Sequence, residues 1–249
     1  MTIKIGHIEA IFLYPVKSMA GVQLEAANLG WHGLDGDRRL AFRRLQDRSG
    51  FPWLSASKLP DLLRFTPVWR DQSIRSHHPT HVRTPEGKEM AIFGEELVTE
   101  VGLRHGAPVQ MMELKHGIFD EASLSVISLE TIREIERVTG TALDVRRFRP
   151  NVVVRLLKPD SFQEDRWVGG VLSFGDAGHG PSLSVTMRDE RCSMVNLDPD
   201  TARSNPEVMK AIVQMNQNNV GIYGAVIRTG QLAVGQTVHL QTFAENEPT

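Results

Sequence analysis

The single cysteine of this 249-residue chain, Cys192, lies in the stretch RDERCSMVNLDPDT. A thiol at this position can serve as a small buried hydrophobic group, as a nucleophile or as a ligand for a soft metal. Arg188 and Arg191 precede it, and neighbouring guanidinium groups favour the thiolate, which attacks electrophiles and binds soft metals. The run LSVTMRDERC leads from a strand-like apolar pattern into a polar segment. We therefore expect Cys192 at the end of a strand, a position that favours a functional thiol over a packing residue.

A second group of residues that could take part in binding or catalysis is mostly basic and lies in or beside three separate turns. They are Lys17 and Ser18 in YPVKS, Arg38 and Arg39 in DGDRR, and Arg146, Arg147, Arg149 and Arg155 in RRFRPNVVVR. A guanidinium group donates two parallel hydrogen bonds to an oxyanion, and a lysine with a hydroxyl group can complete such a cradle. Turns beside strand ends are where loops gather into ligand sites. The sequence leaves open whether these residues bind an anion or are ordinary surface charges.

Other motifs that would indicate a reaction are missing. The chain has no GxxxxGK[ST] loop, no HExxH helix, no dinucleotide-binding glycine spacing and no convincing serine nucleophile elbow. His77, His78 and His81 have the spacing of metal ligands, but the surrounding stretch is polar and lacks a nearby carboxylate, so a solvated loop is the better interpretation. One cysteine also excludes a four-cysteine zinc site or an iron–sulfur cluster built by these residues alone.

The composition is that of a soluble globular protein, with 41% apolar and 23% charged residues. The formal net charge of −2 gives no overall attraction to nucleic acid or to an anionic membrane, so neither is expected as a partner. We find no secretory signal pattern and no apolar run long enough to span a bilayer. A lone cysteine fits a reducing compartment, and together these features predict a cytoplasmic protein without a membrane segment.

Two amphipathic segments predict helices. Residues 128–140 begin with Ser128 as an N-cap and end at Gly140, and their predicted apolar face consists of Leu129, Ile132, Ile135 and Val138. Residues 205–219 begin with Asn205 as an N-cap and Pro206 at the first helical position, and their predicted apolar face consists of Val208, Ile212 and Met215.

Most of the remaining chain predicts short strands separated by turns. The strand candidates are residues 3–14, 22–29, 151–157, 182–187, 224–230 and 235–243. Residues 71–89 predict a turn region or hairpin tip, and residues 102–114 predict a connector that runs into a strand, with a boundary near residue 113. Because strands and helices do not alternate regularly, we expect a barrel or sandwich rather than a doubly wound fold. The predicted fold class is mainly β with a few helices (α+β).

Five stretches resemble those of a known family when they are taken in order. YPVKS, GDR, DEASLSVIS, RRFRPNVVV and RCSMVNLDPDT resemble the motifs of MOSC-domain proteins. The resemblance is strongest to the branch that contains the mitochondrial amidoxime-reducing component and its bacterial relatives. It spans nearly the whole chain, and it implies an N-terminal β-barrel domain at residues 1–113 packed on a MOSC β-barrel at residues 114–249.

The resemblance also implies a cofactor and the residues that hold it. MOSC proteins of this branch bind the molybdenum cofactor, a pterin dithiolene that carries a phosphate. Cys192 matches the cysteine that supplies a thiolate to molybdenum, and is therefore the expected metal ligand and catalytic position. The residues expected to bind the pterin and its phosphate are Lys17, Ser18, Arg38, Ser123, Arg149, Asn151 and Arg191.

The implied activity is that of a molybdenum-dependent oxidoreductase that reduces N-oxygenated small molecules, such as hydroxylamines or amidoximes. With one cysteine and no iron–sulfur cluster, the chain would receive its electrons from a separate flavoprotein, ferredoxin or cytochrome-type donor. The main alternative is a protein that carries the cofactor, or that carries sulfur as a persulfide on Cys192. A third possibility is a barrel that has lost the cofactor and only binds a partner.

The chain departs from the family pattern at four positions. Val195 and Asn196 stand where close relatives have two threonines, and Ala202 stands where a glycine commonly follows DPDT. A tyrosine near the C-terminal cofactor loop of the eukaryotic proteins is replaced around Val226. These changes leave the expected metal ligand and phosphate cradle intact, and they bear on substrate preference and activity.

Overall fold

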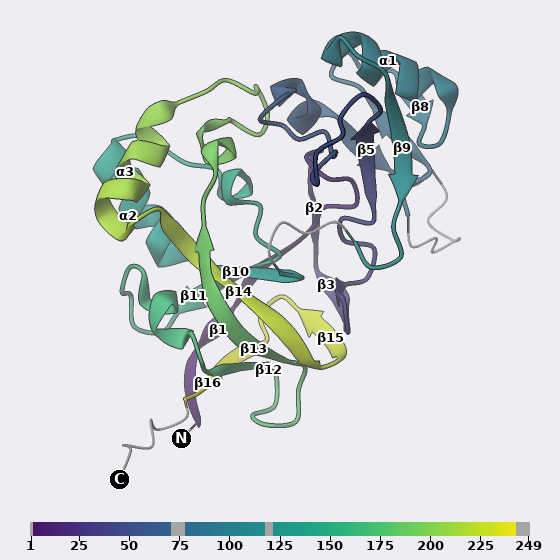
Figure 1. The fold of residues 1–249 in the computed structure, drawn as a ribbon. Coiled ribbons are helices and arrows are strands. Elements are labelled where there is room, and N and C mark those ends of the chain that lie inside the picture. The colour runs from purple at the N-terminus through teal and green to yellow at the C-terminus, as the bar shows by residue number, and fades with distance from the viewer. Residues whose placement is uncertain (1, 71–77, 118–121, 243–249) are drawn as a thin grey trace.

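The computed structural model describes residues 2–70, 78–117 and 122–242 (Figure 1). Its largest unit is a closed seven-stranded β-barrel with the strand order β11-β10-β14-β13-β12-β16-β1. Pairing of β1 with β11 closes the ring. Neighbouring strands are antiparallel except for β10 and β11, which run parallel. β2 (Val22–Leu24) extends the sheet on β1.

The barrel takes its strands from both ends of the chain. They are β1 (Thr2–Leu13), β10 (Leu124–Ser128), β11 (Val152–Leu156), β12 (Val171–Phe174), β13 (Ser182–Glu190), β14 (Asn219–Arg228) and β16 (Thr237–Gln241). Apolar side chains from these strands fill one core, in which Ile8, Ile11 and Phe174 are fully buried. Burial of this apolar surface is what holds the first strand to the distant C-terminal half.

Residues 40–113, together with Val16 and Met19, form a second part with its own apolar core, which lies at the upper right of Figure 1. Its strands are β5 (Leu40–Arg44), which pairs with β9 (Val109–Glu113), and the sheet of β6 (Thr66–Val68), β7 (His81–Arg83) and β8 (Glu89–Ala91). α1 (Glu95–His105) and the 3-10 helix η1 (Pro60–Arg64) contribute to this core. β3 (Ala26–Gly30) and β4 (Gly33–Leu34) pair with β15 (Gly230–Ala233), and their Leu29 and Leu34 belong to the barrel core.

Two helices cover the outside of the barrel, as the sequence predicts. α2 (Leu129–Thr139) begins after Ser128, whose hydroxyl accepts a hydrogen bond from the Thr131 amide, and ends at Gly140 in the left-handed region. α3 (Pro206–Asn216) begins after Asn205, whose side chain accepts a hydrogen bond from the Glu207 amide. Both helices share a hydrophobic core with the outer face of the barrel.

The predicted apolar face of α2 is wrong at one position. Val138 is 44% exposed, whereas Glu130 and Thr131 are buried. The two polar residues are buried because they have partners: Glu130 accepts a hydrogen bond from the Leu156 amide, and Thr131 donates one to the Glu164 carboxylate. Hydrogen bonding offsets the cost of burying such groups, so the polar side of the helix turns inward at its first turn.

α1 is a helix that the sequence analysis missed, and the expected connector at residues 102–114 begins inside it. Gly94 at its N-cap provides no side-chain hydrogen bond, and only Leu97 and Val101 are buried along its length. The usual capping and periodicity signals are therefore weak. The connector does run into the strand β9, as predicted.

The other predicted strands correspond to observed strands, but residues 22–29 form two strands, β2 and β3, and residues 224–230 cover only the second half of β14, whose first residues are not predicted as a strand. Residue 243 of the last predicted strand lies outside the described residues. The mainly β class with a few helices is confirmed. Of the expected turn region at residues 71–89, residues 71–77 lie outside the described residues, as does His77 of the histidine group. Contrary to the expectation that no carboxylate is near, His78 Nε2 lies 2.8 Å from the Glu113 carboxylate, which the fold brings from a distant strand.

The domain boundary near residue 113 stays a prediction. β1 precedes this boundary in the sequence, but it belongs to the barrel that the residues after the boundary mainly build. No helix among the described residues has both the length and the apolar character needed to span a lipid bilayer.

Candidate functional site

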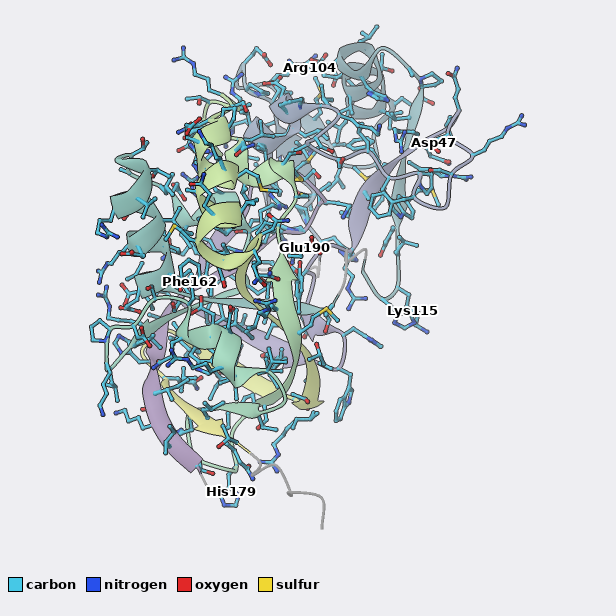
Figure 2. The ribbon with its side chains drawn as sticks, turned by 60° about the vertical axis from the view of Figure 1, so that its left-hand side comes forward. Asp47, Arg104, Lys115, Phe162, His179 and Glu190 are labelled. Atoms are coloured by element: carbon cyan, nitrogen blue, oxygen red, sulfur yellow. The ribbon has the colours of Figure 1, made fainter. Side chains whose placement is uncertain are left out.

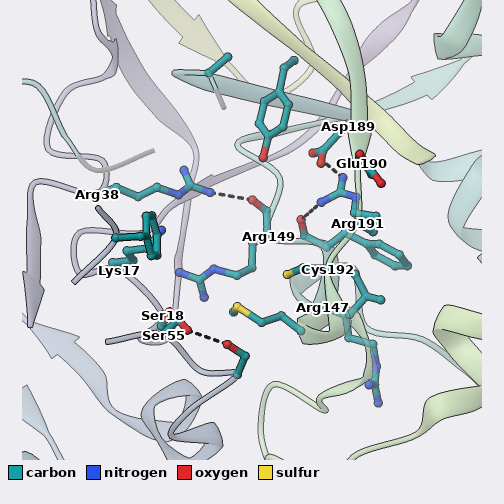
Figure 3. A pocket seen from close by; sticks show the side chains of 17 residues that line it. Lys17, Ser18, Arg38, Ser55, Arg147, Arg149, Asp189, Glu190, Arg191 and Cys192 are labelled. Atoms are coloured by element: carbon teal, nitrogen blue, oxygen red, sulfur yellow. Dashed lines mark hydrogen bonds and ion pairs between the residues drawn. The ribbon is translucent and has the colours of Figure 1, made fainter. Parts of the chain in front are cut away.

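A cavity of about 330 Å³ lies between the barrel and the second part of the chain (Figure 3). Side chains from two sides line it. They are Lys17, Ser18, Arg38, Phe51, Ser55 and Ser57 on one side, and Ala122, Arg147, Phe148, Arg149, Asp189, Glu190, Arg191, Cys192, Met194, Val195 and Tyr223 on the other. Six residues predicted for the site therefore meet here from segments that are far apart in the sequence.

Cys192 follows the end of β13, where the sequence predicts it. The residue is exposed, and it forms the N-cap of the 3-10 helix η4 (Ser193–Asn196). Its sulfur points into the cavity in Figure 3. Because the residue is exposed, Cys192 is not a buried hydrophobic group.

The residues after Cys192 hold its loop against the rest of the protein by apolar packing and hydrogen bonds. Val195 is buried in the core shared by α2, α3 and the barrel. The side-chain oxygen of Asn196 accepts a hydrogen bond from the Met209 amide in α3, at 2.9 Å. The Asn196 carbonyl accepts one from Arg147 at 3.0 Å. The two departures from the family's threonines thus have structural roles, and Val195 also lines the cavity.

Asp198 organises the DPDT turn that follows. One carboxylate oxygen accepts hydrogen bonds from the amides of Asp200 and Thr201 and from the Thr201 hydroxyl, and the other pairs with Arg147 at 3.0 Å. Burial alone would raise the pKa of Asp198, but these hydrogen bonds outweigh it and lower the pKa. Ala202 then adopts φ +57°, a left-handed conformation that explains why glycine is common at this position in the family.

Three residues that line the cavity have left-handed backbones without being glycine. They are Ser18 at φ +66°, Arg38 at +48° and Arg149 at +49°. This conformation costs about 1 kcal/mol for each L-residue. Such strain persists where the surrounding structure imposes it, and it gathers at functional sites. Three of the seven such residues in the described part of the chain thus line this one cavity.

Arg38 and Arg149 are held as a pair. The Arg38 guanidinium donates a hydrogen bond to the Arg149 carbonyl at 2.9 Å. Both guanidinium groups contact the ring of Tyr14, at 5.0 Å and 4.2 Å from its centroid. Burial raises the pKa of Tyr14 to about 12, although the two cations oppose this shift, so the ring stays neutral. Gly21 makes room for that ring, because a Cβ there would lie 2.3 Å from Tyr14 Cε1.

A buried carboxylate and an amide fix the position of Arg38 from behind. Asp37 is fully buried, pairs with Arg38 and accepts a hydrogen bond from the Tyr14 amide at 2.8 Å. Asn151 is also fully buried, and its oxygen accepts hydrogen bonds from Arg38 at 3.3 Å and from the Ser125 amide at 3.2 Å. Asn151 therefore contacts Arg38 behind the cavity and is not among the lining residues.

Arg191 connects the Cys192 strand to its neighbours. Its guanidinium donates hydrogen bonds of 2.7 Å to the carbonyls of Val220 and Phe148, and lies 2.7 Å from the Asp189 carboxylate. Asp189 in turn accepts a hydrogen bond from the Ser125 hydroxyl at 2.9 Å. The Arg191 side chain is only 7% exposed. Its contacts set the end of β13, and through it the position of Cys192.

Several basic residues of the sequence motifs are not in the cavity. Arg146 pairs with Asp144 and Asp200, and Arg155 pairs with Glu9, all on the protein surface or partly buried. The Arg188 guanidinium lies 3.6 Å from the Asp165 carboxylate, and Arg188 does not line the cavity. Ser123 does not line the cavity, and its carbonyl packs against Gly33, where a Cβ would lie 2.4 Å away.

Sequence reasoning missed some of the residues that line the cavity. Phe51, Ser55 and Ser57 come from a segment without a recognised motif, and the Ser55 and Ser57 hydroxyls lie 2.7 Å apart. The Phe51 ring lies 5.2 Å from the ammonium group of Lys17, whose residue is 6% exposed. Tyr223, three residues before Val226, places a phenol in the cavity.

Comparison with known proteins agrees with this architecture. The MOSC domain model matches residues 104–239, and the model of the MOSC N-terminal beta barrel domain matches residues 5–122. The crystal structure of the YUAD protein from Bacillus subtilis shares the fold at 15% identity, covering 98% of both chains with a TM-score of 0.53. YiiM from Geobacillus stearothermophilus is 18% identical over 50% of this chain and 56% of its own, with a TM-score of 0.38. No curated protein matches the chain. The two family matches together span nearly the whole sequence, and the chain belongs to the MOSC domain family, with a MOSC N-terminal β-barrel domain ahead of its MOSC domain.

Proposed function

We propose that the cavity binds the molybdenum cofactor and that the protein is a molybdenum-dependent oxidoreductase for N-oxygenated compounds. One observation carries the proposal: a single exposed thiol and a set of cations on strained backbones line the same cavity. A soft metal requires the thiolate, and a phosphate requires the cations. Membership of the MOSC family supports this choice of cofactor.

The cationic side of the cavity fits the phosphate end of the cofactor. Lys17, Ser18, Arg38 and Arg149 would supply ammonium, hydroxyl and guanidinium donors to its oxygens. Arg38 and Arg149 are already fixed by each other and by the Tyr14 ring, so little side-chain entropy would be lost on binding. Asn151 would act indirectly, by holding Arg38.

The thiol side fits the metal end. Cys192 would supply a thiolate ligand, and the contacts of Arg191 and Asp189 would hold that thiolate at the end of β13. When bound, the cofactor supplies two-electron reduction of an N–O bond. The protein's own residues position the ligand, the phosphate and the substrate.

The overall reaction consumes two electrons and two protons, so that R–NH–OH becomes R–NH₂ and water. Phe51, Phe148 and Met194 offer an apolar wall for the organic part of a small substrate. Glu190 and Tyr223 offer hydrogen-bonding groups for its N–OH end. The electrons would come from a separate flavoprotein, ferredoxin or cytochrome-type donor. We place the protein in the cytoplasm, where a free thiol stays reduced.

A carrier role is the second candidate, because Cys192 is exposed and accessible to a sulfur donor. In that role the thiol would hold a persulfide, or the cavity would store the cofactor for delivery. This candidate requires the same exposed thiol but no turnover of an N–O substrate.

Turnover distinguishes the two candidates. The full chain, isolated from cells that make the cofactor, is given reduced methyl viologen and benzamidoxime or a hydroxylamine, and formation of the amidine or the amine is measured. We expect the wild type to form these products and Cys192→Ala to form none. A wild-type protein that carries cofactor but reduces none of several N–O substrates would contradict the reductase proposal. A persulfide on Cys192 in the mass spectrum would then support the carrier.

A further inference from the structure

One segment beside the cavity has a charge unlike that of the whole chain. Residues 38–58 contain six Lys and Arg residues and a single acidic residue, Asp47, which gives this segment a net charge of +5 in a chain of net charge −2. The same segment supplies Arg38, Phe51, Ser55 and Ser57 to the cavity lining. Of its cations only Arg38 lines the cavity, and the others belong to the same segment as the lining residues Phe51, Ser55 and Ser57.

The loop that carries this charge is built by its own hydrogen bonds. Arg44 pairs with Asp47 and donates a hydrogen bond of 2.9 Å to the Phe51 carbonyl. Asp47 also accepts one of 2.7 Å from the Ser49 amide. Arg44 and Asp47 thus neutralise each other while they shape the loop. Figure 2 shows Asp47 at the outer margin of the second part of the chain.

Three further cations of this segment face the solvent, whereas Arg39 is only partly exposed. Arg43, Arg48 and Lys58 are exposed, and within residues 2–70, 78–117 and 122–242 none of them has an ion-pair partner. Leu45 and Phe51, from the same loop, are exposed at 49% and 44%. We call these five residues the basic lip. Exposed apolar side chains together with unpaired charges of one sign are the composition of a protein-docking surface.

We propose that the basic lip docks an acidic protein that delivers single electrons to the cavity. The proposal rests on the proposed reductase function and names the surface and charge of its donor. Charge complementarity selects an acidic partner, and Phe51, which belongs both to the lip and to the cavity lining, makes the docking surface continuous with the site. The exposed Leu45 and Phe51 favour a protein over a nucleic acid.

The experiment compares two reductants on the cofactor-loaded full chain. One is a reduced plant-type [2Fe–2S] ferredoxin, an acidic one-electron protein of which two molecules are oxidised per N–O bond reduced. The other is reduced methyl viologen, which needs no docking surface. The test variant is Arg48→Glu/Lys58→Glu. The matched control is Lys4→Glu/Lys158→Glu, which makes the same charge change at two exposed lysines near the start of β1 and the end of β11.

We expect the ferredoxin-driven rate constant of the wild type to fall about tenfold as salt rises from about 50 mM to about 500 mM. At low salt the test variant should lose about tenfold in this rate constant, whereas the control variant keeps it within about twofold. Viologen-driven turnover should be the same in all three proteins.

Equal ferredoxin rates in the test and control variants would overturn the proposal. A wild type that viologen cannot drive would instead contradict the reductase function, and binding of fluorescently labelled ferredoxin at low salt then tests the lip by itself. We expect the test variant alone to weaken that binding by about tenfold. If the test variant loses binding of labelled duplex DNA but keeps ferredoxin binding, the lip is a nucleic-acid surface and the proposal is wrong.

Discussion

Asp37→Asn probes the support beneath the cationic side of the cavity. Asp37 is fully buried and is the carboxylate partner of Arg38, whose side chain is 14% exposed. Asparagine keeps the shape and an oxygen that can accept the hydrogen bond from the Tyr14 amide. The substitution therefore removes the negative charge of Asp37 beside the Arg38 cation and little else.

Removing one partner from a buried ion pair costs about 3–5 kcal/mol. Arg38 keeps its hydrogen bond to the Arg149 carbonyl and its contact with the Tyr14 ring, and it is not fully buried. We therefore expect the lower end, a loss of about 3 kcal/mol in the free energy of unfolding. Urea unfolding followed by tryptophan fluorescence measures it.

A double-mutant cycle with Arg38→Gln checks the cause of this loss. If an uncompensated charge is responsible, Asp37→Asn/Arg38→Gln should lose less than the sum of the single variants by at least about 1.5 kcal/mol. A loss below about 1 kcal/mol in Asp37→Asn, or additive losses in the cycle, would refute the reasoning.

Three further substitutions test the local structure, each by urea unfolding. Ala202→Gly should raise the free energy of unfolding by about 1 kcal/mol, because glycine relieves the left-handed backbone, and a loss would contradict that account. Gly21→Ala should lower it by about 2 kcal/mol, because the new methyl group meets the Tyr14 ring, and an unchanged stability would show that the ring moves freely. Burial raises the pKa of Glu164, so its contribution to stability is present below the ordinary glutamate pKa and is lost as pH rises through the raised value. Glu164→Gln should lack this decline, and parallel pH profiles of the two proteins would contradict it.

The sequence predicts elements well where the signal is local. The caps of α2 and α3 are read from Ser128, Gly140 and Asn205 because each cap involves residues within a few positions. The periodicity predicts Val138 on the apolar face, but Val138 is exposed and Glu130 is buried, because Glu130 hydrogen-bonds to a strand that comes later in the chain. The apolar periodicity of a helix cannot predict a hydrogen-bond partner that comes from a distant segment of the chain.

The same limit separates the predicted from the missed parts of the site. Cys192, Lys17 and Arg38 stand in motifs, and the sequence alone indicates them. Phe51 reaches the cavity because the second part of the chain packs against the barrel, and Tyr223 because β14 pairs with β10 and β13 inside the barrel. Nothing in their local sequence marks either residue. These residues line the cavity because of the tertiary structure and not because they belong to a sequence motif.

Arg191 shows a further limit, which concerns role rather than position. The motif predicts a cofactor-binding residue beside Cys192, and the structure does bring Arg191 to the cavity wall. Its guanidinium, however, bonds to Val220, Phe148 and Asp189. Residue type alone cannot distinguish an arginine that binds an anion from one that fastens neighbouring strands.

The amount of molybdenum and pterin bound per chain tests the central claim most directly. The wild type, Cys192→Ala, Arg38→Gln/Arg149→Gln and the surface control Arg133→Gln are isolated from cells that make the cofactor, and metal and pterin are quantified. We predict near-equal molar amounts of both in the wild type and the control, loss of molybdenum in Cys192→Ala, and loss of both in the double variant. A folded wild-type protein without molybdenum and pterin, or a double variant that retains both in full, would contradict the assignment of this cavity as the cofactor site.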